Sequence, residues 1–284
     1  MNRFLAVAIG IIVFFGHAAD ASTVQLPKTG QNTCYAVSGS AISCGGTGQD
    51  GDWKAGVSVG QRFTVGTGSQ AACVTDNLTG LMWMQSPVGT ALDWQATLDY
   101  VQGTVNASGG LCGFTDWRVP AVVELETMVH TEESNSAVFL NTQGFSNIQS
   151  GNYWSSSTNA SNLLWAWYVT MSEGLVYNSG AKTAAGINNV WPVRSNNPIA
   201  PAVTWESGQK TCSDSGVVGV ILCTGTGQDA DLKPGVPWPN PRFTNNGNGT
   251  VTDNLTGLIW LKNASCFGQQ AWDIALVSSN TLKG

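Results

Sequence analysis

The stretch TDNLTGLMW at residues 75–83 decides the fold, because it returns almost unchanged as TDNLTGLIW at residues 252–260. Upstream of each copy, the sequence GTGQD occurs at residues 46–50 and again at residues 225–229. A match of this length and order identifies an internal repeat, which must be recognised before any element is assigned. The chain therefore contains two copies of one type of domain.

The two copies differ in length. The first copy continues well beyond its first predicted helix to Asn196, whereas the second stops near the equivalent point, at Gly284. We predict a complete domain with a Gly-rich N-terminal segment at residues 22–196, a linker at residues 197–202 and a truncated second copy at residues 203–284. Two prolines among small residues make the predicted linker short, stiff and extended. We expect weaker local stability in the truncated copy.

The N-terminus has the pattern of a secretory signal peptide. Arg3 precedes an almost wholly apolar run at residues 4–15, and Ala19-Asp20-Ala21 offers small residues for cleavage. This pattern predicts a signal peptide at residues 1–21, and the run is too short for an ordinary membrane span; the alternative is a buried N-terminal helix. We expect a mature chain that does not span a membrane and is secreted, periplasmic or on a bacterial cell surface.

The composition restricts the partners. Charged residues make up 11% of the chain, which has a net charge of −6 and contains 34 Gly and 12 Trp. Ordinary domains contain about 25% charged residues. A weakly charged, acidic chain does not favour nucleic acid as a partner. The composition indicates a loop-rich extracellular fold with aromatic packing.

The seven cysteines agree with export, because disulfides are the default in an exported chain. None lies in a C-x-x-C pair, so a zinc ribbon or thioredoxin-type site is not expected. Comparison of the two copies predicts two short-range bridges and one bridge of the first copy alone, namely Cys34–Cys44, Cys212–Cys223 and Cys73–Cys112. Cys266 is predicted to be unpaired.

The first copy is predicted to be β-rich at both ends with helices between. Strands are expected at residues 62–65, 80–84, 153–156, 165–171, 175–177 and 190–193. This order predicts an α+β fold, in which two helices flank small, twisted antiparallel sheets. We expect residues 62–195 to close around one compact aromatic core that brings Trp83, Trp117 and Trp167 together.

The two helices carry recognisable start signals. Thr90 and Asp93 have the spacing of a capping box, and Trp94, Leu98 and Val101 follow at the spacing of one buried helix face. Gly103 is a suitable helix stop. The second helix is expected to start at Pro120, with Val122, Leu125 and Val129 as its apolar face.

Four motifs in order resemble the Lcl C-terminal domain family, which is named for collagen-like bacterial adhesins. They are VTDNLTGLMW at residues 74–83, DWRVP at 116–120 with Glu124-Leu125, YWSSS at 153–157, and AWYV at 166–169 followed by Val193-Arg194. The resemblance implies a C-type-lectin-like fold and adhesion-type roles, including binding of sulfated polysaccharides. This chain departs from the collagen-like adhesin in having no Gly-X-Y tract, and its negative charge does not favour such a ligand. The second copy keeps only the first motif.

Five residues are candidates for ligand binding. Asp116 and Arg118 could line a sugar or anion site with Trp117 as a stacking platform, and Trp154 and Trp191 could stack on a sugar. The alternative is structural: Trp117 in the core, Arg118 in an internal ion pair, and the strand tryptophans in the core. We favour the structural interpretation for both sets.

Metal binding and catalysis find little support. The acidic loop residues Asp50, Asp52 and Asp76 lack the ligand spacing of a calcium loop, so no cofactor is expected, although calcium stays possible. His130 is the only histidine after residue 21, so a catalytic triad would need it. It follows a predicted helix and precedes Glu132-Glu133, which is typical of a solvated helix end. A related fold hosts formylglycine-generating enzymes, but the cysteines here are predicted to be structural.

The sequence thus favours a secreted or envelope-exposed, non-catalytic module that binds a polysaccharide or a cell-surface partner. A structural or protein-interaction module of a surface assembly is the alternative, and an enzyme is the least favoured. An exposed aromatic groove would support the first function, and a broad apolar face would support the second. Fold alone does not decide between them.

Overall fold

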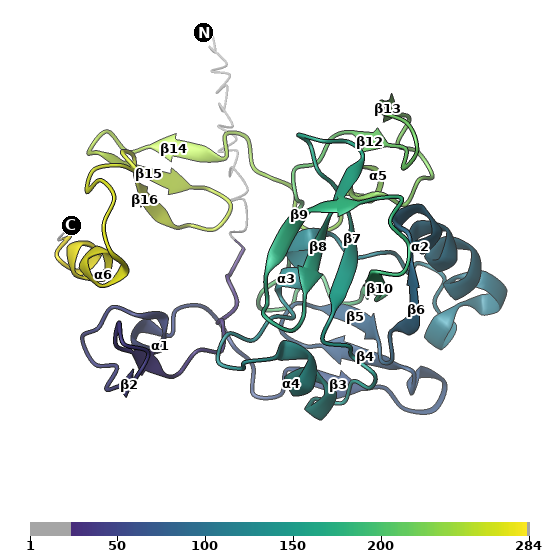
Figure 1. Ribbon diagram of the computed structural model, residues 1–284, viewed down its shortest axis with the longest axis horizontal. Helices are drawn as coiled ribbons and strands as arrows, with labels where there is room; N and C mark the ends of the chain where they lie inside the picture. Colours follow the sequence, from purple (N-terminus) through teal and green to yellow (C-terminus); the bar gives the residue numbers. More distant parts are fainter. Residues whose placement is uncertain (1–23, 283–284) are drawn as a thin grey trace, which may run out of the picture.

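The structure is a computed structural model that describes residues 24–282 (Figure 1). The predicted signal peptide at residues 1–21 lies outside the described residues. Along the chain we distinguish the first stapled segment (residues 24–57), the first body (residues 62–196), the second stapled segment (residues 202–236) and the second body (residues 242–282).

The first body contains two small sheets, which confirms the predicted mixed fold with small, mainly antiparallel sheets. The four-stranded sheet has the order β11-β5-β4-β3, with β3 (Phe63–Val65), β4 (Cys73–Asp76), β5 (Leu81–Met84) and β11 (Val193–Ser195). The five-stranded sheet has the order β6-β10-β7-β8-β9, with β6 (Val88–Leu92), β7 (Asn152–Thr158), β8 (Trp165–Thr170), β9 (Val176–Ala181) and β10 (Asn188–Val190). Only β7 and β10 pair in parallel within these two sheets. The predicted strand at residues 190–193 is divided between the two sheets.

The first helix starts later than predicted. Thr90 belongs to β6, and Asp93 is the N-cap of α2 (Trp94–Tyr100), where its carboxylate accepts a hydrogen bond from the backbone N–H of Ala96. The prediction of a capping box that starts at Thr90 is therefore wrong, because Asp93 caps the helix without it. Gly103 does not stop the helix either, since a π-helical turn, η2 (Val101–Val105), continues through it.

The second helix is short, and a third was missed. In α3 (Val122–Glu126), the side chain of Glu124 accepts a hydrogen bond from the backbone N–H of Ala121 at the helix start. Val129 lies beyond this helix. A further helix, α4 (Ser136–Thr142), forms where no helix was predicted, and Asn135 caps it. Three 3₁₀ turns complete the body: η1 (Gly68–Gln70), η3 (Ala107–Gly109) and η4 (Leu111–Gly113).

The repeated TDNLTG motif forms a tight turn around a buried carboxylate. Asp76 is fully buried, and it accepts hydrogen bonds from the backbone N–H of Leu78 (3.0 Å) and from Thr79 Oγ1 (2.8 Å). Arg62 forms an ion pair with it at 3.0 Å. In the second copy Asp253 makes the same contacts, with Leu255, Thr256 and Arg242. In both copies a single carboxylate accepts the hydrogen bonds that hold the turn together, so the motif forms the same turn twice.

The buried aromatic residues form two clusters rather than the single core that we predicted. Trp83 belongs to the cluster beneath the four-stranded sheet, together with Trp191, whose ring centroid lies 4.8 Å away. Trp117 belongs to the second cluster, which packs around α2. Trp167 is only half-buried and belongs to neither cluster. The two clusters share a contact with Met84.

The stapled segments are two versions of one small unit. Each contains a hairpin of two short strands followed by a single helical turn. In the first segment these are β1 (Cys34–Tyr35), β2 (Ala41–Ile42) and α1 (Asp50–Trp53). In the second they are β12 (Cys212–Ser213), β13 (Val220–Ile221) and α5 (Asp229–Leu232). The predicted disulfides Cys34–Cys44, Cys212–Cys223 and Cys73–Cys112 are all confirmed. Cys266 is free and exposed, as predicted.

The second body repeats only the start of the first. It contains the three-stranded sheet of β14 (Phe243–Asn245), β15 (Thr250–Asp253) and β16 (Ile259–Leu261), followed by α6 (Trp272–Asn280). In Figure 1 these elements lie on the opposite side of the molecule from the five-stranded sheet of the first body. No residue of α6 is buried.

The linker is not an extended spacer. Residues 198–202 form turns, and the backbone N–H groups of Asn196 and Asn197 donate to the carbonyl of Gly80. Gly80 has a φ of +75°, and Asn197 leaves no room there for a Cβ. The prediction of an extended linker is therefore wrong, because the chain folds back against the TDNLTG turn. The proposed domain boundaries on either side of it stay a prediction.

Candidate functional site

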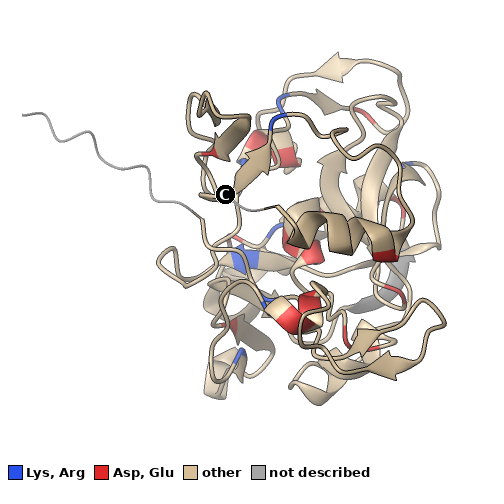
Figure 2. Cartoon of the chain, turned by 90° about the vertical axis from the view of Figure 1, so that its left-hand side faces the viewer, with Lys and Arg blue, Asp and Glu red and all other residues tan. Residues whose placement is uncertain are grey.

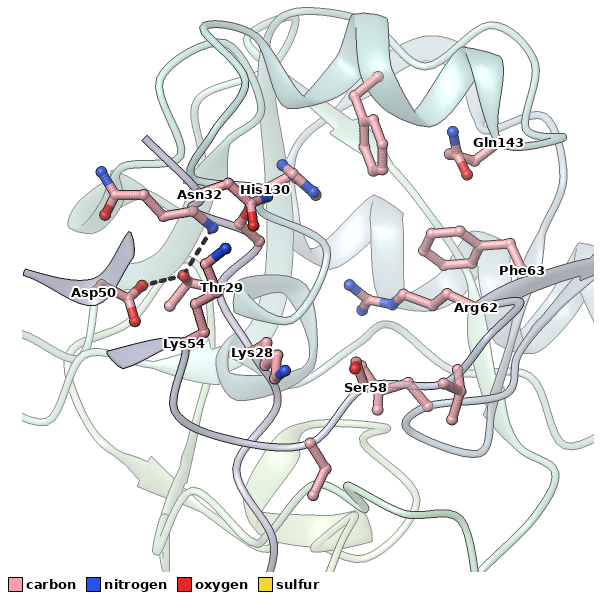
Figure 3. Close-up of a pocket in the computed structure, with 16 residues that line it drawn as sticks. Lys28, Thr29, Asn32, Asp50, Lys54, Ser58, Arg62, Phe63, His130 and Gln143 are labelled. Carbon is pink, nitrogen blue, oxygen red and sulfur yellow. Dashed lines mark hydrogen bonds between the residues drawn. The ribbon is translucent and has the colours of Figure 1, made fainter. Parts of the chain in front are cut away.

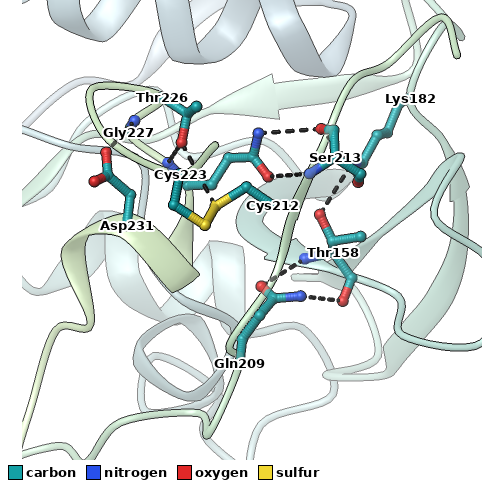
Figure 4. The surroundings of a disulfide bond; sticks show 10 residues. Thr158, Lys182, Gln209, Cys212, Ser213, Cys223, Thr226, Gly227 and Asp231 are labelled. Atoms are coloured by element: carbon teal, nitrogen blue, oxygen red, sulfur yellow. Dashed lines mark hydrogen bonds between the residues drawn. A yellow bond between two sulfur atoms is a disulfide. The ribbon is translucent and has the colours of Figure 1, made fainter. Parts of the chain in front are cut away.

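The second stapled segment is seated on the first body through a pair of backbone contacts. The side-chain amide of Gln209 accepts a hydrogen bond from the backbone N–H of Thr158 (2.9 Å) and donates one to its carbonyl (2.7 Å) (Figure 4). Thr158 is the last residue of β7. The amide thus replaces the backbone partner that the end of this strand lacks.

A buried lysine lies beside this contact. Lys182 is fully buried, and its ammonium donates to Thr158 Oγ1 (2.8 Å) and to Ser213 Oγ (2.7 Å) of the second stapled segment (Figure 4). The same ammonium lies 3.8 Å from the centre of the Trp94 ring. Burial lowers the pKa of Lys182 to about 8. The group therefore connects α2, β7 and the second stapled segment.

A buried carboxylate makes the third contact. The Ser157 hydroxyl donates to Asp229, which is also buried and lies at the start of α5. Burial raises the pKa of Asp229, and the hydrogen bonds from Ser157 and Ser207 oppose this effect. Lys182, Ser157 and Asp229 have no role in the sequence predictions, although they hold the two repeats together.

Equivalent residues show that the docking is reciprocal. The backbone N–H of Ala202 donates to the carbonyl of Leu78 (2.8 Å), and the N–H of Val24 donates to the carbonyl of Leu255 (2.6 Å). Leu78 and Leu255 occupy the same position of the TDNLTG motif. Each stapled segment therefore donates a backbone hydrogen bond to the turn of the other repeat.

The helices repeat this relationship. Gly227 of the second stapled segment lies against Gln102 at the end of the first body's helix, and Gly48 of the first lies against Asn280 of α6. Gly48 and Gly227 are the same glycine of the GTGQD repeat. Gly48 has a φ of +71° and Gly227 a φ of +67°, and this left-handed backbone conformation favours glycine at both positions.

The first stapled segment also has contacts of its own with the first body. Glu132 accepts hydrogen bonds from the backbone N–H groups of Asn32 (2.8 Å) and Thr33 (3.1 Å), and from the Thr33 hydroxyl. These hydrogen bonds lower the pKa of Glu132. The N–H of Thr131 donates to the carbonyl of Thr29. The loop after α3 thus holds this segment beside the first body.

A cleft of about 360 Å³ opens between these two parts (Figure 3). We call it the lysine cleft, because Lys28, Lys54 and Arg62 line it. Among the residues in the described range, Lys28 and Lys54 form no salt bridge, and both are exposed. Asp50 also lines the cleft and accepts a hydrogen bond from the Thr29 hydroxyl. The cleft therefore has an excess of positive charge in a chain of net charge −6.

The predicted Asp116-Trp117-Arg118 site lines a second cleft of about 420 Å³, bordered by residues 225–232 of the second stapled segment. Its side chains are already engaged within the protein. Arg118 forms two hydrogen bonds of 2.6 Å with buried Glu124, and Asp116 pairs with Arg194 at 2.7 Å. The Trp117 ring is buried, and its N–H donates to the carbonyl of Leu111. Trp117 therefore lies in the core and Arg118 forms an internal ion pair, as the structural interpretation expected. The Asp116 side chain is exposed at the edge of the cleft.

Trp154 and Trp191 are fully buried, which agrees with the structural interpretation that we favoured and leaves neither ring free to stack on a ligand. The Trp154 N–H donates to the carbonyl of Leu92, and that of Trp191 donates to the carbonyl of Met84. Trp154 lies on β7 and Trp191 lies between β10 and β11, and burial of both rings in the core stabilises the first body.

In the described residues, no hydrogen bond joins the His130 ring to another side chain. Its ring packs on Phe139 at 4.3 Å between centroids and lies against Gly30. Its Nδ1 is buried without a hydrogen-bond partner, and burial lowers the pKa of the imidazole. A nucleophile that this base could activate is thus missing from its hydrogen-bond contacts.

The described residues contain neither a cluster of metal ligands nor a membrane-spanning helix. Over residues 24–282, no group of three or more His, Cys, Asp and Glu side chains gathers in a way that could hold a metal ion. No helix in that range has the length and apolar character needed to cross a bilayer. Charged residues are scattered among uncharged ones in the view of Figure 2.

Comparison with known proteins identifies one family. A search of curated proteins gave no match. The family model described as the Lcl C-terminal domain matches residues 72–194, which lie within the first body, and the match supports a surface-associated module. The three disulfides are consistent with an extracellular location. The chain therefore carries an Lcl C-terminal domain at residues 72–194, as its four motifs predict.

Proposed function

We propose that this chain is a non-catalytic, surface-associated interaction module, in which a stapled segment joins one repeat to the body of the other. The contact between Gln209 and Thr158 carries the proposal, because one side chain there binds both backbone groups of a residue in another repeat. Buried polar groups pair only in a defined geometry, so such contacts select one arrangement of two parts. Lys182 and Asp229 add two further buried polar contacts to the same joint.

The family resemblance supports this function. An Lcl C-terminal domain implies a C-type-lectin-like fold and an adhesion-type role at a bacterial surface. The surroundings of His130 support a non-catalytic role, because its contacts are aromatic packing and backbone rather than a nucleophile. The buried tryptophans support it as well, because their function is to build the core.

The joint is tested by cutting the chain beside it. Ile199 is highly exposed, so a specific protease site introduced there is accessible without disturbing the core. After cleavage, the C-terminal piece should co-elute with the first body in gel filtration. The same cut in a Gln209→Ala, Asp229→Ala variant should release the piece, whereas Gln31→Ala, Asp50→Ala should not. Separation of the two pieces in the otherwise unchanged chain would contradict the proposal.

A second candidate function is binding of an acidic saccharide, and the lysine cleft is the observation that favours it. Lys28 and Lys54 have no acidic partner in the described range, and the guanidinium of Arg62 faces the same cleft (Figure 3). Sulfate or carboxylate groups of a polysaccharide would supply the missing negative charge. We propose binding without a cofactor, so calcium and a chelator should give the same result.

Retention on immobilised heparin, with dextran as the neutral control, tests this second function. Lys54 ends α1 with a φ of +46°, and Lys233 ends α5 with a φ of +44°. Asn tolerates this conformation, so Lys54→Asn and Lys233→Asn are matched variants. Lys54→Asn combined with Lys28→Ala should elute at distinctly lower salt, whereas Lys233→Asn should elute unchanged. Equal retention on dextran would count against saccharide recognition by charge.

A further inference from the structure

The loop between Cys212 and Cys223 carries an exposed run of aliphatic side chains. Residues 216–222 are all glycine, valine, isoleucine or leucine, and we call them the aliphatic loop. Five side chains of this loop are between 40% and 88% exposed: Val217, Val218, Val220, Ile221 and Leu222. Scattered exposed apolar residues are ordinary, but a contiguous apolar patch marks an interaction site.

The base of the aliphatic loop is fixed to the first body. Cys212 and Ser213 are fully buried, and the disulfide to Cys223 closes the loop. The Ser213 hydroxyl donates a hydrogen bond to the carbonyl of Leu163 (3.0 Å) and accepts one from Lys182 (2.7 Å). Figure 1 places β13 at the edge of the molecule, well away from β14, β15, β16 and α6. The loop is thus presented from a rigid base, which lowers the entropic cost of binding.

The equivalent loop of the first stapled segment shows that the hairpin does not need these side chains. Both loops form the same two-stranded hairpin, and a disulfide closes each. In the first loop, Ala41 and Ser43 occupy the positions of Val220 and Leu222. Since the hairpin forms with a small and a polar residue at these positions, its folding does not explain the aliphatic residues of the second loop.

The size and chemistry of the aliphatic loop favour a lipid bilayer over a protein partner. One fully exposed aliphatic side chain presents roughly 60–120 Å² of apolar surface, so the five side chains at their observed exposures present no more than roughly 400 Å². A stable protein–protein interface buries about 800 Å² on each partner and contains hydrogen bonds. The side chains of the aliphatic loop contain no hydrogen-bonding group. Reversible binding to a bilayer, in contrast, strengthens with each apolar side chain that is buried.

We propose that the aliphatic loop docks this chain on the surface of a lipid bilayer, with the side chains of residues 217–222 inserted at the boundary between headgroups and acyl chains. Asp214 is the only charged residue between the two cysteines, and it stays at the level of the headgroups. Because the loop contains no Lys or Arg, docking does not depend on anionic lipid or on low salt.

This inference deepens the proposed function, because it names the surface with which the module associates. The cleavage experiment at Ile199 reports only on the joint at Gln209. A failure of the joint and a failure of bilayer docking are therefore distinguishable.

Co-sedimentation of the exported chain with phosphatidylcholine vesicles, at low and at high salt, tests the inference. We expect binding at both salt concentrations. Val218→Asp should weaken it by about tenfold or more, because a carboxylate does not enter the apolar layer. Val37→Asp is the matched control and should bind unchanged, because Val37 is 74% exposed in the first loop and Val218 is 73% exposed in the second. Hydrogen exchange over residues 216–222 should slow on vesicles, whereas exchange over residues 36–42 should not.

Absence of vesicle binding would overturn the inference, as would equal binding by Val218→Asp. Binding that is lost at high salt and in Lys28→Ala, Lys54→Asn would belong to the lysine cleft, and binding that only Ile259→Asp removes would belong to the second body. Either result would contradict docking through the loop. Self-association of the chain without vesicle binding, abolished by Val218→Asp, would show that the loop binds a second copy instead.

Discussion

Gln209 and Thr158 are joined by two hydrogen bonds of 2.9 and 2.7 Å, although they belong to different repeats. The backbone of Thr158 ends a strand of the first body, and the amide of Gln209 satisfies both of its polar groups. A repeat in the sequence is therefore not the same as a packed unit in the structure, because part of the second repeat packs on the first body. The first body is completed by a segment that follows it in the chain.

Removal of this amide should cost stability. Gln209→Ala leaves the buried N–H and carbonyl of Thr158 without partners, which typically costs about 1–3 kcal/mol. Gln31→Ala removes the equivalent amide, which binds no strand, and should change the free energy of unfolding by less than about 0.5 kcal/mol. Chemical denaturation of the two variants measures the difference. Equal effects would argue against the docking contact.

Asp229 should make folding less favourable at neutral pH. Burial raises its pKa in the folded state, so the folded chain binds more protons than the unfolded chain between the unfolded and folded pKa values. Stability should then fall as the pH rises through this window. Asp229→Asn keeps an acceptor for Ser157 and should abolish that fall, while Asp50→Asn should not. Unfolding free energies measured from pH 3 to 8 test this; a persistent fall in Asp229→Asn would disprove the assignment.

Lys182 should act at alkaline pH and with the opposite slope. Its folded pKa of about 8 lies below the ordinary value of 10.5, so the unfolded chain binds more protons between these two values. Stability should therefore rise from about pH 8 to pH 10.5, by up to about 3 kcal/mol at 1.36 kcal/mol per pKa unit. Lys182→Met should remove this rise, and exposed Lys262→Met should keep it.

Above about pH 10, the titration of Tyr153 should also change the free energy of unfolding. Burial raises the pKa of Tyr153 to about 12, so the unfolded chain loses its phenol proton first and stability should fall above about pH 10. This fall should remain in Lys182→Met. If the rise below pH 10.5 also remains in that variant, the lysine is not its source.

The pair of Arg118 and Glu124 should be sensitive to removal of one partner. Glu124 is fully buried, and Arg118 neutralises it through two hydrogen bonds of 2.6 Å. Arg118→Met leaves a buried charge unpaired and should cost about 3–5 kcal/mol. The double variant Arg118→Met, Glu124→Leu should recover most of this loss, because no charge is then buried. A double variant as unstable as Arg118→Met alone would show that the unpaired Glu124 charge is not the cause of the loss.

The sequence predicted what local patterns determine. The disulfides Cys34–Cys44 and Cys212–Cys223 followed from the repeat, and the strands near Trp83 and Trp154 followed from alternation and turn residues. The buried face of α2 followed from the spacing of Trp94, Leu98 and Val101. These features depend on neighbours in the chain, so their signal lies within short windows.

The docking site could not be predicted in the same way. Lys182 is an ordinary lysine in sequence, and only its tertiary surroundings of Trp94, Thr158 and Ser213 reveal its burial. Thr158 and Gln209 meet because two repeats pack, which no periodicity encodes. An alignment of the two stapled segments would have paired Gln31 with Gln209, and this was the one available signal.

Two aromatic residues that the sequence offered as candidate ligand-binding residues lie in the core. Trp154 and Trp191 were candidates because exposed tryptophans bind sugars, yet both lie in the core. Sequence alone does not distinguish an inward from an outward aromatic residue on a strand whose neighbours are also apolar. Other tryptophans are exposed, and two of them, Trp260 and Trp272, match core residues of the first body in position.

Hydrogen exchange at the Thr158 amide tests the central claim most directly, because Gln209 Oε1 is its hydrogen-bond acceptor. We predict strong protection in the unchanged chain, protection largely lost in Gln209→Ala, and protection retained in Gln31→Ala. Rapid exchange of the Thr158 amide in the unchanged chain, or identical exchange in both variants, would contradict docking of the second stapled segment on the first body.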